Sequence, residues 1–157
     1  MVRPVLLFAW RLLLGAWVGA LLCFGVLVAP ALFRTLPPAE AGAVVRQVIP
    51  ALDLYGMAAA AALLLLSTGE GRDRRTWIRR GLLGGMGVLA ALSFLAITPR
   101  MEALRAEAAG RISDLPSTDA RRQEFGRLHG ASSAASAAVL VLGLASLGIQ
   151  PRPRARP

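Results

Sequence analysis

The stretch L-L-L-G-A-W-V-G-A-L-L-C-F-G-V-L-V-A-P-A-L-F, residues 12–33, decides the fold because it holds 22 residues without a charge. A helix needs about 20 predominantly apolar residues to cross the hydrocarbon core of a bilayer. A cleaved signal peptide is the rival interpretation, but its apolar region covers only about 7–15 residues and ends at a small-residue cleavage site. This stretch is longer, and Arg34 follows Phe33 directly. We therefore predict a transmembrane helix over about residues 5–33.

Three further uncharged runs follow, over residues 54–69, 81–99 and 130–151, in a chain that is 55% hydrophobic and 17% charged. The first of these runs reaches spanning length only if its helix starts near Ile49, with Asp53 in the first turn. The prediction is an all-α four-transmembrane-helix bundle that forms one integral membrane domain over residues 1–150, followed by a basic tail over 151–157. The helices are expected at about 5–33, 50–69, 78–98 and 127–149.

Arginine placement predicts the orientation. All 18 basic residues are arginines, which favours a GC-rich and therefore bacterial source. The N-terminus, the connection between the second and third helices and the tail share ten of them: Arg3, Arg11, Arg72, Arg74, Arg75, Arg79, Arg80, Arg152, Arg154 and Arg156. The positive-inside rule puts these parts in the cytoplasm. We expect a multi-pass protein of a bacterial inner membrane, and we attribute its net charge of +9 to topology rather than to nucleic-acid binding.

Short amphipathic helices are predicted in the two outer loops. In the first loop, Pro38 can open a helix that has one apolar face and that Pro50 ends. In the second, Thr98 and Pro99 can begin a helix that ends at Gly110. These helices would lie at the membrane surface rather than cross it.

Small residues at a four-residue spacing indicate close helix packing, because lipid supplies no hydrophobic drive between helices and small side chains let backbones approach. They are Gly15 and Gly19, Gly81 and Gly85, and Ser132 and Ser136. We favour packing within the bundle, with a homodimer seam as the alternative. The single cysteine, Cys23, continues the first of these faces and is interpreted as a buried structural thiol.

Polar residues gather at the predicted outer ends of the helices. They are Asp53 at the start of the second helix, Arg100 and Glu102 after the third, and Arg127 and His129 at the start of the fourth. An up-down-up-down bundle puts these five at one depth, and polar groups inside a membrane usually face the bundle. They form the candidate functional cluster. The alternative is structural: a helix cap, arginines that reach the headgroups, and a histidine that hydrogen-bonds across the bundle.

Enzyme motifs are absent from the sequence: it has no phosphate-binding loop, dinucleotide fingerprint or zinc-protease helix. One histidine and one cysteine are too few for a usual metal cage, so no catalytic residue and no cofactor is predicted. We expect a non-enzymatic packing, interaction or small transport-related module that contacts the lipid bilayer and, as a candidate partner, a second copy or another membrane protein. The alternative is a haem- or copper-handling protein that uses His129 as its metal ligand.

Several stretches resemble one family: V-A-P-A-L-F-R-T-L-P (28–37), A-G-A-V-V (41–45), I-T-P-R-M-E-A-L-R (97–105) and F-G-R-L-H-G-A-S (125–132). They are similar to the transmembrane protein 205-like family, whose bacterial members carry a domain of unknown function. The matching positions are Pro30, Phe33, Gly42, Pro99, Arg100, Glu102, His129 and Gly130. The resemblance implies a four-helix membrane protein and no particular reaction. A more distant similarity to four-helix proteins linked to copper uptake and to a haem-containing oxidase underlies the cofactor alternative.

Overall fold

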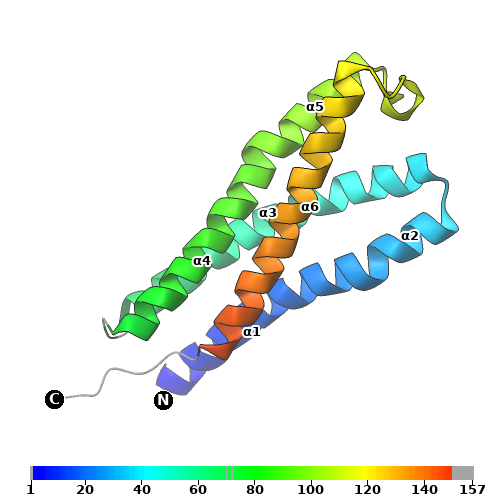
Figure 1. Cartoon of the computed structure of the whole chain (residues 1–157). Helices are drawn as coiled ribbons and strands as arrows, with labels where there is room; N and C mark the ends of the chain where they lie inside the picture. The colour runs from blue at the N-terminus through cyan, green and yellow to red at the C-terminus, as the bar shows by residue number, and fades with distance from the viewer. Residues whose placement is uncertain (1, 70, 72, 150–157) are drawn as a thin grey trace.

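Four long helical spans make up the structure, a computed structural model that describes residues 2–69, 71 and 73–149 (Figure 1). The first span comprises α1 (Val2–Cys23), the π-helical segment η1 (Phe24–Val28) and α2 (Ala29–Thr35). The second is α3 (Pro38–Leu66), followed by the 3₁₀ turn η2 (Ser67–Gly69). The third comprises α4 (Arg74–Leu92), the π-helical segment η3 (Ser93–Ile97) and α5 (Thr98–Glu107). The 3₁₀ turn η4 (Ile112–Asp114) leads to the fourth span, α6 (Ala120–Gly148).

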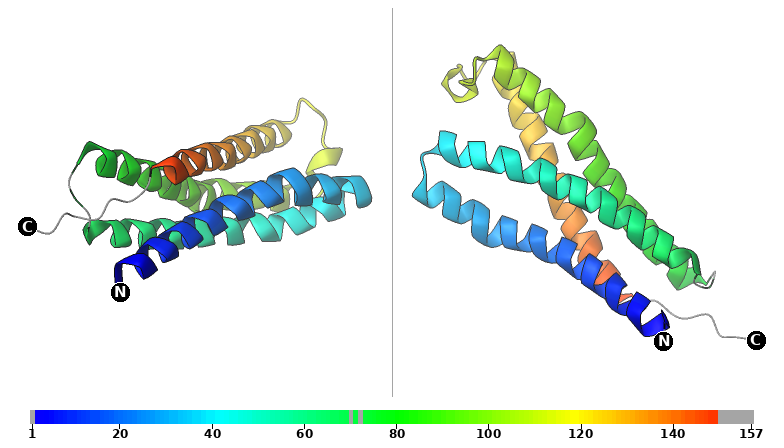
Figure 2. Two further views of the ribbon diagram at one scale, coloured as in Figure 1. Left: turned by 90° about the horizontal axis from the view of Figure 1, so that it is seen from below. Right: turned by 180° about the vertical axis from the view of Figure 1, so that it is seen from behind.

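The spans run up and down as two helix hairpins. Val2, the connection between α3 and α4, and the end of α6 lie at one end of the bundle, which we call the terminal end (Figures 1 and 2). The connections α2–α3 and α5–α6 lie at the other, the loop end. Around the bundle, α3 contacts α1 and α4, and α6 contacts the same two helices. The tips of the two hairpins diverge toward the loop end in both figures.

The outward surface of every span is apolar. Phe8 is 67% exposed, Leu27 65%, Leu65 70%, Leu95 65% and Val141 64%. Exposed side chains of this kind on every helix are unfavourable in water and suit contact with lipid chains. All four spans are long and apolar enough to cross a membrane. The predicted all-α four-helix bundle is confirmed, and the chain is a multi-pass integral membrane protein.

The core occupies the half of the bundle nearer the terminal end. Leu14, Trp17, Leu63, Leu83 and Met86 are almost completely buried there. Toward the loop end, by contrast, none of the described residues 19–35 and 120–138 is buried. The continuous four-helix core therefore lies in the terminal half, and Ala41, Met101 and Leu104 are buried separately nearer the loop end.

Three glycines let the helices approach in that core. A β-carbon built on Gly56 would lie 2.7 Å from the ring of Trp17, and one on Gly87 would lie 2.9 Å from Cβ of Ala60. A β-carbon on Gly143 would lie 2.5 Å from Cγ2 of Val18. Such distances are too short for real carbon atoms, so the absence of a side chain sets the helix separation at these points.

Prolines explain the two π-helical segments. Pro30 and Pro99 each stand at the second residue of the α-helix that follows a π-helical segment. A proline has no amide hydrogen, and its ring clashes with the carbonyl group four residues earlier, which lies inside η1 or η3. The wider π turn relieves this clash and keeps both spans continuous.

The predicted helix boundaries needed correction. Pro50 was predicted to separate a surface helix from the second span, but it lies inside the continuous α3. A membrane helix tolerates an interior proline when neighbouring helices, hydroxyl side chains, water or a local change of helix type satisfy the backbone groups that the proline frees. The helix predicted from Thr98 is α5, which continues the third span directly, and the fourth span starts at Ala120 rather than near residue 127. The predicted tail, residues 151–157, and Arg72 lie outside the described residues.

Candidate functional site

Asp53 lies in the middle of the second span rather than at its end. It is the sixteenth of the 29 residues of α3. At about 1.5 Å of rise per residue, it is about 20 Å from either end of the helix. The hydrocarbon core of a bilayer is about 30 Å thick, so Asp53 lies inside the part of α3 that crosses it.

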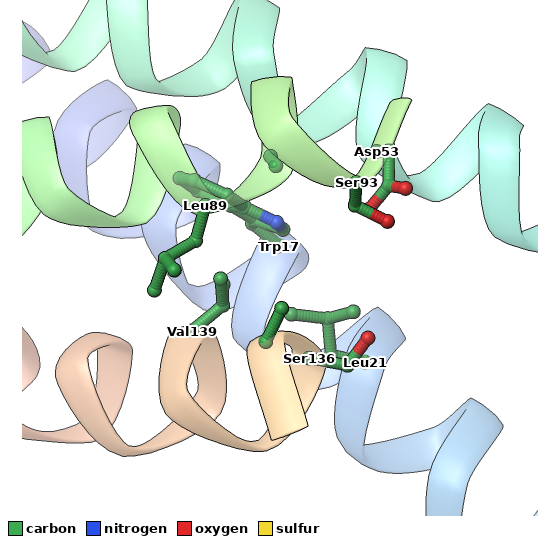
Figure 3. Close-up of a pocket in the computed structure, with 9 residues that line it drawn as sticks. Trp17, Leu21, Asp53, Leu89, Ser93, Ser136 and Val139 are labelled. Carbon is green, nitrogen blue, oxygen red and sulfur yellow. The ribbon is translucent and has the colours of Figure 1, made fainter. Parts of the chain in front are cut away.

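The carboxyl group of Asp53 points into a small cavity at the level where the hairpins begin to diverge (Figure 3). All four spans line it: Trp17, Leu21, Asp53, Leu89, Ala90, Ser93, Ala135, Ser136 and Val139. Its volume is about 10 Å³, which is close to the space that one water molecule needs. Asp53 is the only titratable residue among the nine.

Two of the polar atoms at this cavity lack partners. Asp53 is 8% exposed and Ser93 is 2% exposed. The Asp53 and Ser93 side chains extend toward each other and interact (Figure 3), although Oδ2 of Asp53 and Oγ of Ser93 do not reach the geometry of a full hydrogen bond within the described part of the chain. Buried polar atoms are nearly always hydrogen-bonded, so an unpartnered pair at a cavity suggests a ligand or solvent site.

Ser136 completes the polar side of the cavity from the fourth span. Its hydroxyl donates to the carbonyl oxygen of Ser132 at 3.1 Å. The lone pairs of Oγ are still available to accept a hydrogen bond from a group in the cavity. Ser132 and Ser136 were predicted as packing residues, and Ser136 serves the cavity instead.

Arg100 and Glu102 lie near the loop end in a separate ion-pair network. Nε and Nη2 of Arg100 donate to the two carboxylate oxygens of Glu124 at 2.7 and 3.0 Å, which joins α5 to α6. Glu102 accepts from Arg105 on its own helix. It also lies 3.9 Å from Nη1 of Arg46, which links α5 to α3 and thereby the two hairpins. Arg100 and Glu102 therefore form ion pairs with other residues near the loop end, and Asp53 lies apart from them.

His129 and Arg127 are exposed on α6. The imidazole ring of His129 stacks on the ring of Phe125, with 6.5 Å between the ring centroids. The guanidinium group of Arg105 also contacts the Phe125 ring, at 4.8 Å from its centroid. Among the described residues, no three His, Cys, Asp or Glu side chains come together as a metal site.

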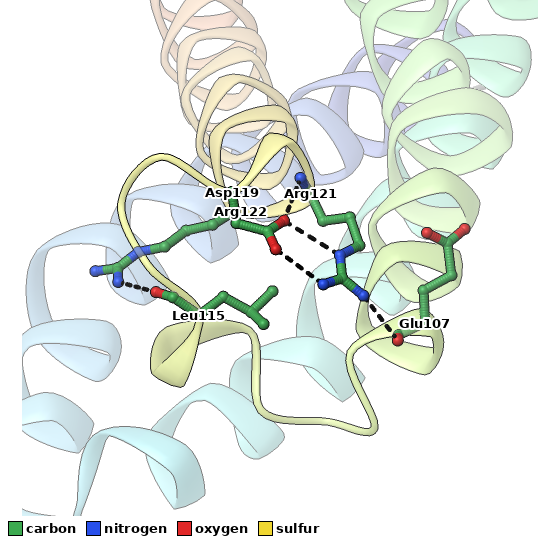
Figure 4. Close-up of polar contacts among 5 residues, drawn as sticks. All are labelled: Glu107, Leu115, Asp119, Arg121 and Arg122. Atoms are coloured by element: carbon green, nitrogen blue, oxygen red, sulfur yellow. Dashed lines mark hydrogen bonds and ion pairs between the residues drawn. The ribbon is translucent and has the colours of Figure 1, made fainter.

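The long loop before α6 is held by its own arginines (Figure 4). Asp119 caps α6 by accepting from the backbone amide of Arg121 at 2.8 Å, and it also accepts from Nη2 of Arg121 at 2.8 Å. These hydrogen bonds lower the pKa of Asp119 from its ordinary value of 3.8 to about 2. Arg122 donates to the carbonyl oxygen of Leu115 and fixes the other side of the loop.

Most of the glycines that were predicted to pack against neighbouring helices have no close neighbour within the bundle. A β-carbon on Gly15, Gly19 or Gly81 would meet nothing within 4 Å, whereas one on Gly85 would contact Leu142 at 3.6 Å. The packing role predicted for Gly15, Gly19 and Gly81 within the bundle is therefore wrong. A homodimer seam stays a prediction.

Cys23 is exposed as well, so its interpretation as a buried thiol is also wrong. The four-residue spacing marks one face of α1, but it does not tell which face turns toward the neighbouring helices. The large side chains of Trp17 and Val18 occupy the inward face instead.

Ser93 and Trp17 are the site residues that the sequence analysis missed. Ser93 is the one polar residue in the middle of the uncharged run 81–99, and it stands six residues before Pro99. A lone polar residue at that position, where a proline disturbs the helix, is the signal that could have identified it.

Fold and site together define a class, the small four-span membrane proteins built from two helix hairpins, here with a buried carboxyl group between the spans. Within this class the chain belongs to the family described as "Domain of unknown function (DUF4149)", which matches residues 12–110. The match includes Asp53 and Ser93 and ends before α6. No curated protein and no solved structure gives a significant match to the chain.

Proposed function

We propose that this protein is a small, non-enzymatic, transport-related protein of a bacterial inner membrane, and that Asp53 is its binding centre. One observation carries the proposal: a buried carboxylate oxygen that lacks full hydrogen-bond geometry in the described chain lines a cavity between the four spans, at a depth inside the membrane. A charged side chain is costly at that depth, and acidic residues inside transmembrane segments typically mark ion pathways and proton relays.

The arginine distribution supports an orientation with the terminal end in the cytoplasm. Arg74, Arg75 and Arg80 lie near the start of the third span, and the guanidinium group of Arg80 lies 5.6 Å from the centroid of the exposed Trp77 ring. Tryptophan and arginine together are typical of the membrane interface, and arginine-rich connections stay in the cytoplasm. The loop end, with its balanced ion pairs, would then face outward.

Proteoliposomes test the proposal. The purified protein is reconstituted, a membrane potential is set with potassium and valinomycin, and the entry of protons and Na⁺ is followed with internal dyes. We expect cation movement above that of empty liposomes and its loss in Asp53→Asn. Asp114→Asn, which changes an exposed carboxyl group in the loop-end turn η4, is the matched control and should behave like the wild type.

Two results would contradict the proposal. Wild-type liposomes that are no more permeable than empty ones would remove the transport assignment. Equal fluxes in the wild type and in a folded Asp53→Asn variant would remove Asp53 as the centre.

The second candidate function is haem or copper handling through His129. The favouring observation is that His129 is exposed, with its ring oriented by Phe125. A single histidine can serve as an axial haem ligand, whereas copper needs further donors that the described residues do not gather around it. An absorption spectrum and metal analysis of the purified protein test this candidate. A Soret band or bound copper that disappears in His129→Ala would favour it, and a colourless, metal-free protein would contradict it.

A further inference from the structure

Resting on the proposed function, we infer that the ligand of the Asp53 cavity is a proton, which reaches the carboxyl group from the loop end. Proton binding converts the carboxylate and a hydronium ion into a neutral carboxylic acid and a water molecule. No redox partner or further reactant is required.

The size and the lining of the cavity favour a proton over a metal cation. The cavity has a volume of about 10 Å³, room for about one water molecule. Its side-chain oxygens come from Asp53, Ser93 and Ser136 only, and its other walls are apolar. A cation that leaves water must replace its hydration shell with several oxygen ligands, and Ca²⁺, for example, takes six to eight. A proton needs one oxygen.

Among the described residues that line the cavity, none carries a positive charge that could pair with Asp53. Trp17 and Leu21 face Asp53 from the first span, Ser93 from the third, and Ser136 and Val139 from the fourth, and none of them titrates in the physiological range. A buried carboxylate without a paired cation costs several kcal/mol. A bound proton removes that charge without any coordination shell.

The hydroxyl groups suit both forms of the carboxyl group. A carboxylic acid is a hydrogen-bond donor, and Oγ of Ser93, which has no partner among the described residues, can accept from it. After the proton leaves, the Ser93 hydroxyl can rotate and donate to the carboxylate. Ser136 offers a second acceptor, because its own hydrogen already donates to the carbonyl oxygen of Ser132.

Burial determines the direction of access. Below the cavity, Leu14, Leu63, Leu83 and Met86 are fully buried, and Gly143 packs against Val18. Above it, no described residue of 19–35 or 120–138 is buried and the hairpin tips diverge (Figure 2), although Ala41, Met101 and Leu104 are buried on that side. On that side the Arg46–Glu102 ion pair links the two hairpins, and both of its side chains are nearly half exposed. The bundle is therefore packed more densely on the terminal side of the cavity than on the loop side.

Dicyclohexylcarbodiimide tests the inference, because this apolar reagent adds to protonated carboxyl groups. The full-length wild-type protein is labelled in nanodiscs over a pH series, and the adduct on the peptide that contains Asp53 is quantified by mass spectrometry. We expect the Asp53 adduct to fall about tenfold per pH unit above its titration midpoint. Na⁺ and K⁺ should leave it unchanged. Ser93→Ala should shift the midpoint, whereas Ser133→Ala, an exposed site on α6, should not.

Each outcome bears on one assignment. If Na⁺ or K⁺ suppresses the adduct at constant pH, the ligand is a metal cation, and the proton inference fails while the transport proposal stands. If Asp53 stays unlabelled at every pH while a loop carboxyl group reacts, the group does not bind protons, and the inference fails again. The transport proposal fails separately, in the flux measurement with Asp53→Asn.

Discussion

Gly143 shows how one missing side chain controls the packing of three helices. A β-carbon there would lie 2.5 Å from Cγ2 of Val18 and 3.1 Å from Cε of Met86. Overpacking of this kind typically costs about 1–3 kcal/mol. We expect Gly143→Ala to lower the free energy of unfolding in detergent by about that amount, measured by thermal or denaturant unfolding. Gly19→Ala is the control and should stay within about 0.5 kcal/mol of the wild type, because nothing lies within 4 Å. Equal effects of the two substitutions would refute the packing role.

Asp119 gives a prediction with a defined pH window. Its folded-state pKa of about 2 lies below the ordinary value of 3.8, so its contribution to stability is fully present above about 3.8 and disappears as the pH falls to about 2. We expect Asp119→Ala to reduce the protection of the first amides of α6 against hydrogen exchange at neutral pH. The difference from the wild type should close between about pH 4 and pH 2. A difference that persists below pH 2 would show that the charge of Asp119 is not its cause.

The residue scale also marks the limit of sequence reasoning about the site. Asp53 was predicted as one of five polar residues at the outer ends of the helices, whereas the structure places it within α3 and apart from the other four. The sequence could not show that Ser93 and Ser136 line the same cavity as Asp53, because the three residues are far apart in the chain and meet only when their helices pack. The hairpin crossing that brings them together depends on where Gly56 and Gly143 allow close contact.

At the element scale, Pro99 sets the direction of α5. The π turn of η3 holds an extra residue, so the helix beyond it is rotated relative to a regular α-helix by about 100°, the angle per residue. We expect Pro99→Ala to favour a regular helix and to separate Arg100 from Glu124. The measurement is disulfide formation between cysteines introduced as Arg100→Cys and Glu124→Cys in a Cys23→Ala background. The yield should fall when Pro99→Ala is added, and an unchanged yield would mean that the proline does not maintain the π turn.

Helix boundaries were predictable only where charge marks them. The third span begins at Arg74, close to the predicted residue 78, because charged residues precede the uncharged run, but it continues to Glu107 rather than ending at residue 98. The first outer loop was harder, since Pro50 and the polar residues before it resemble a helix end. In the structure, however, the residues on both sides of Pro50 belong to one continuous helix of 29 residues, α3. The tolerance of membrane helices for proline depends on tertiary surroundings that a sequence window does not contain.

At the scale of the whole molecule, the four spans put the connections α2–α3 and α5–α6 on one side of the membrane and the connection α3–α4 on the other. Thiol labelling of intact cells tests this topology, in a Cys23→Ala background that leaves no native cysteine. A membrane-impermeant maleimide should label Ser117→Cys in the loop-end turn at once, and Arg75→Cys at the terminal end only after lysis. The reverse pattern would invert the orientation, and equal labelling of both in intact cells would contradict the four-span topology.

The whole fold was the most predictable level, because four long uncharged runs suffice to define four spans. The unequal packing of the two halves was not predictable. It arises because Trp17 and Val18 fill the terminal half, whereas a β-carbon on Gly25, Gly126 or Gly130 would meet nothing within 4 Å. Which half of a bundle is filled depends on three-dimensional contacts between distant segments.

Infrared spectroscopy of the Asp53 carboxyl group tests the central claim most directly. The purified protein in nanodiscs is titrated, and the C=O stretching band of neutral carboxylic acids is compared between the wild type and Asp53→Asn. The account predicts a wild-type band that disappears as the pH rises, that is missing in Asp53→Asn, and that does not respond to Na⁺. A wild-type spectrum identical to that of Asp53→Asn at every pH would contradict the account, because Asp53 would then never hold a proton.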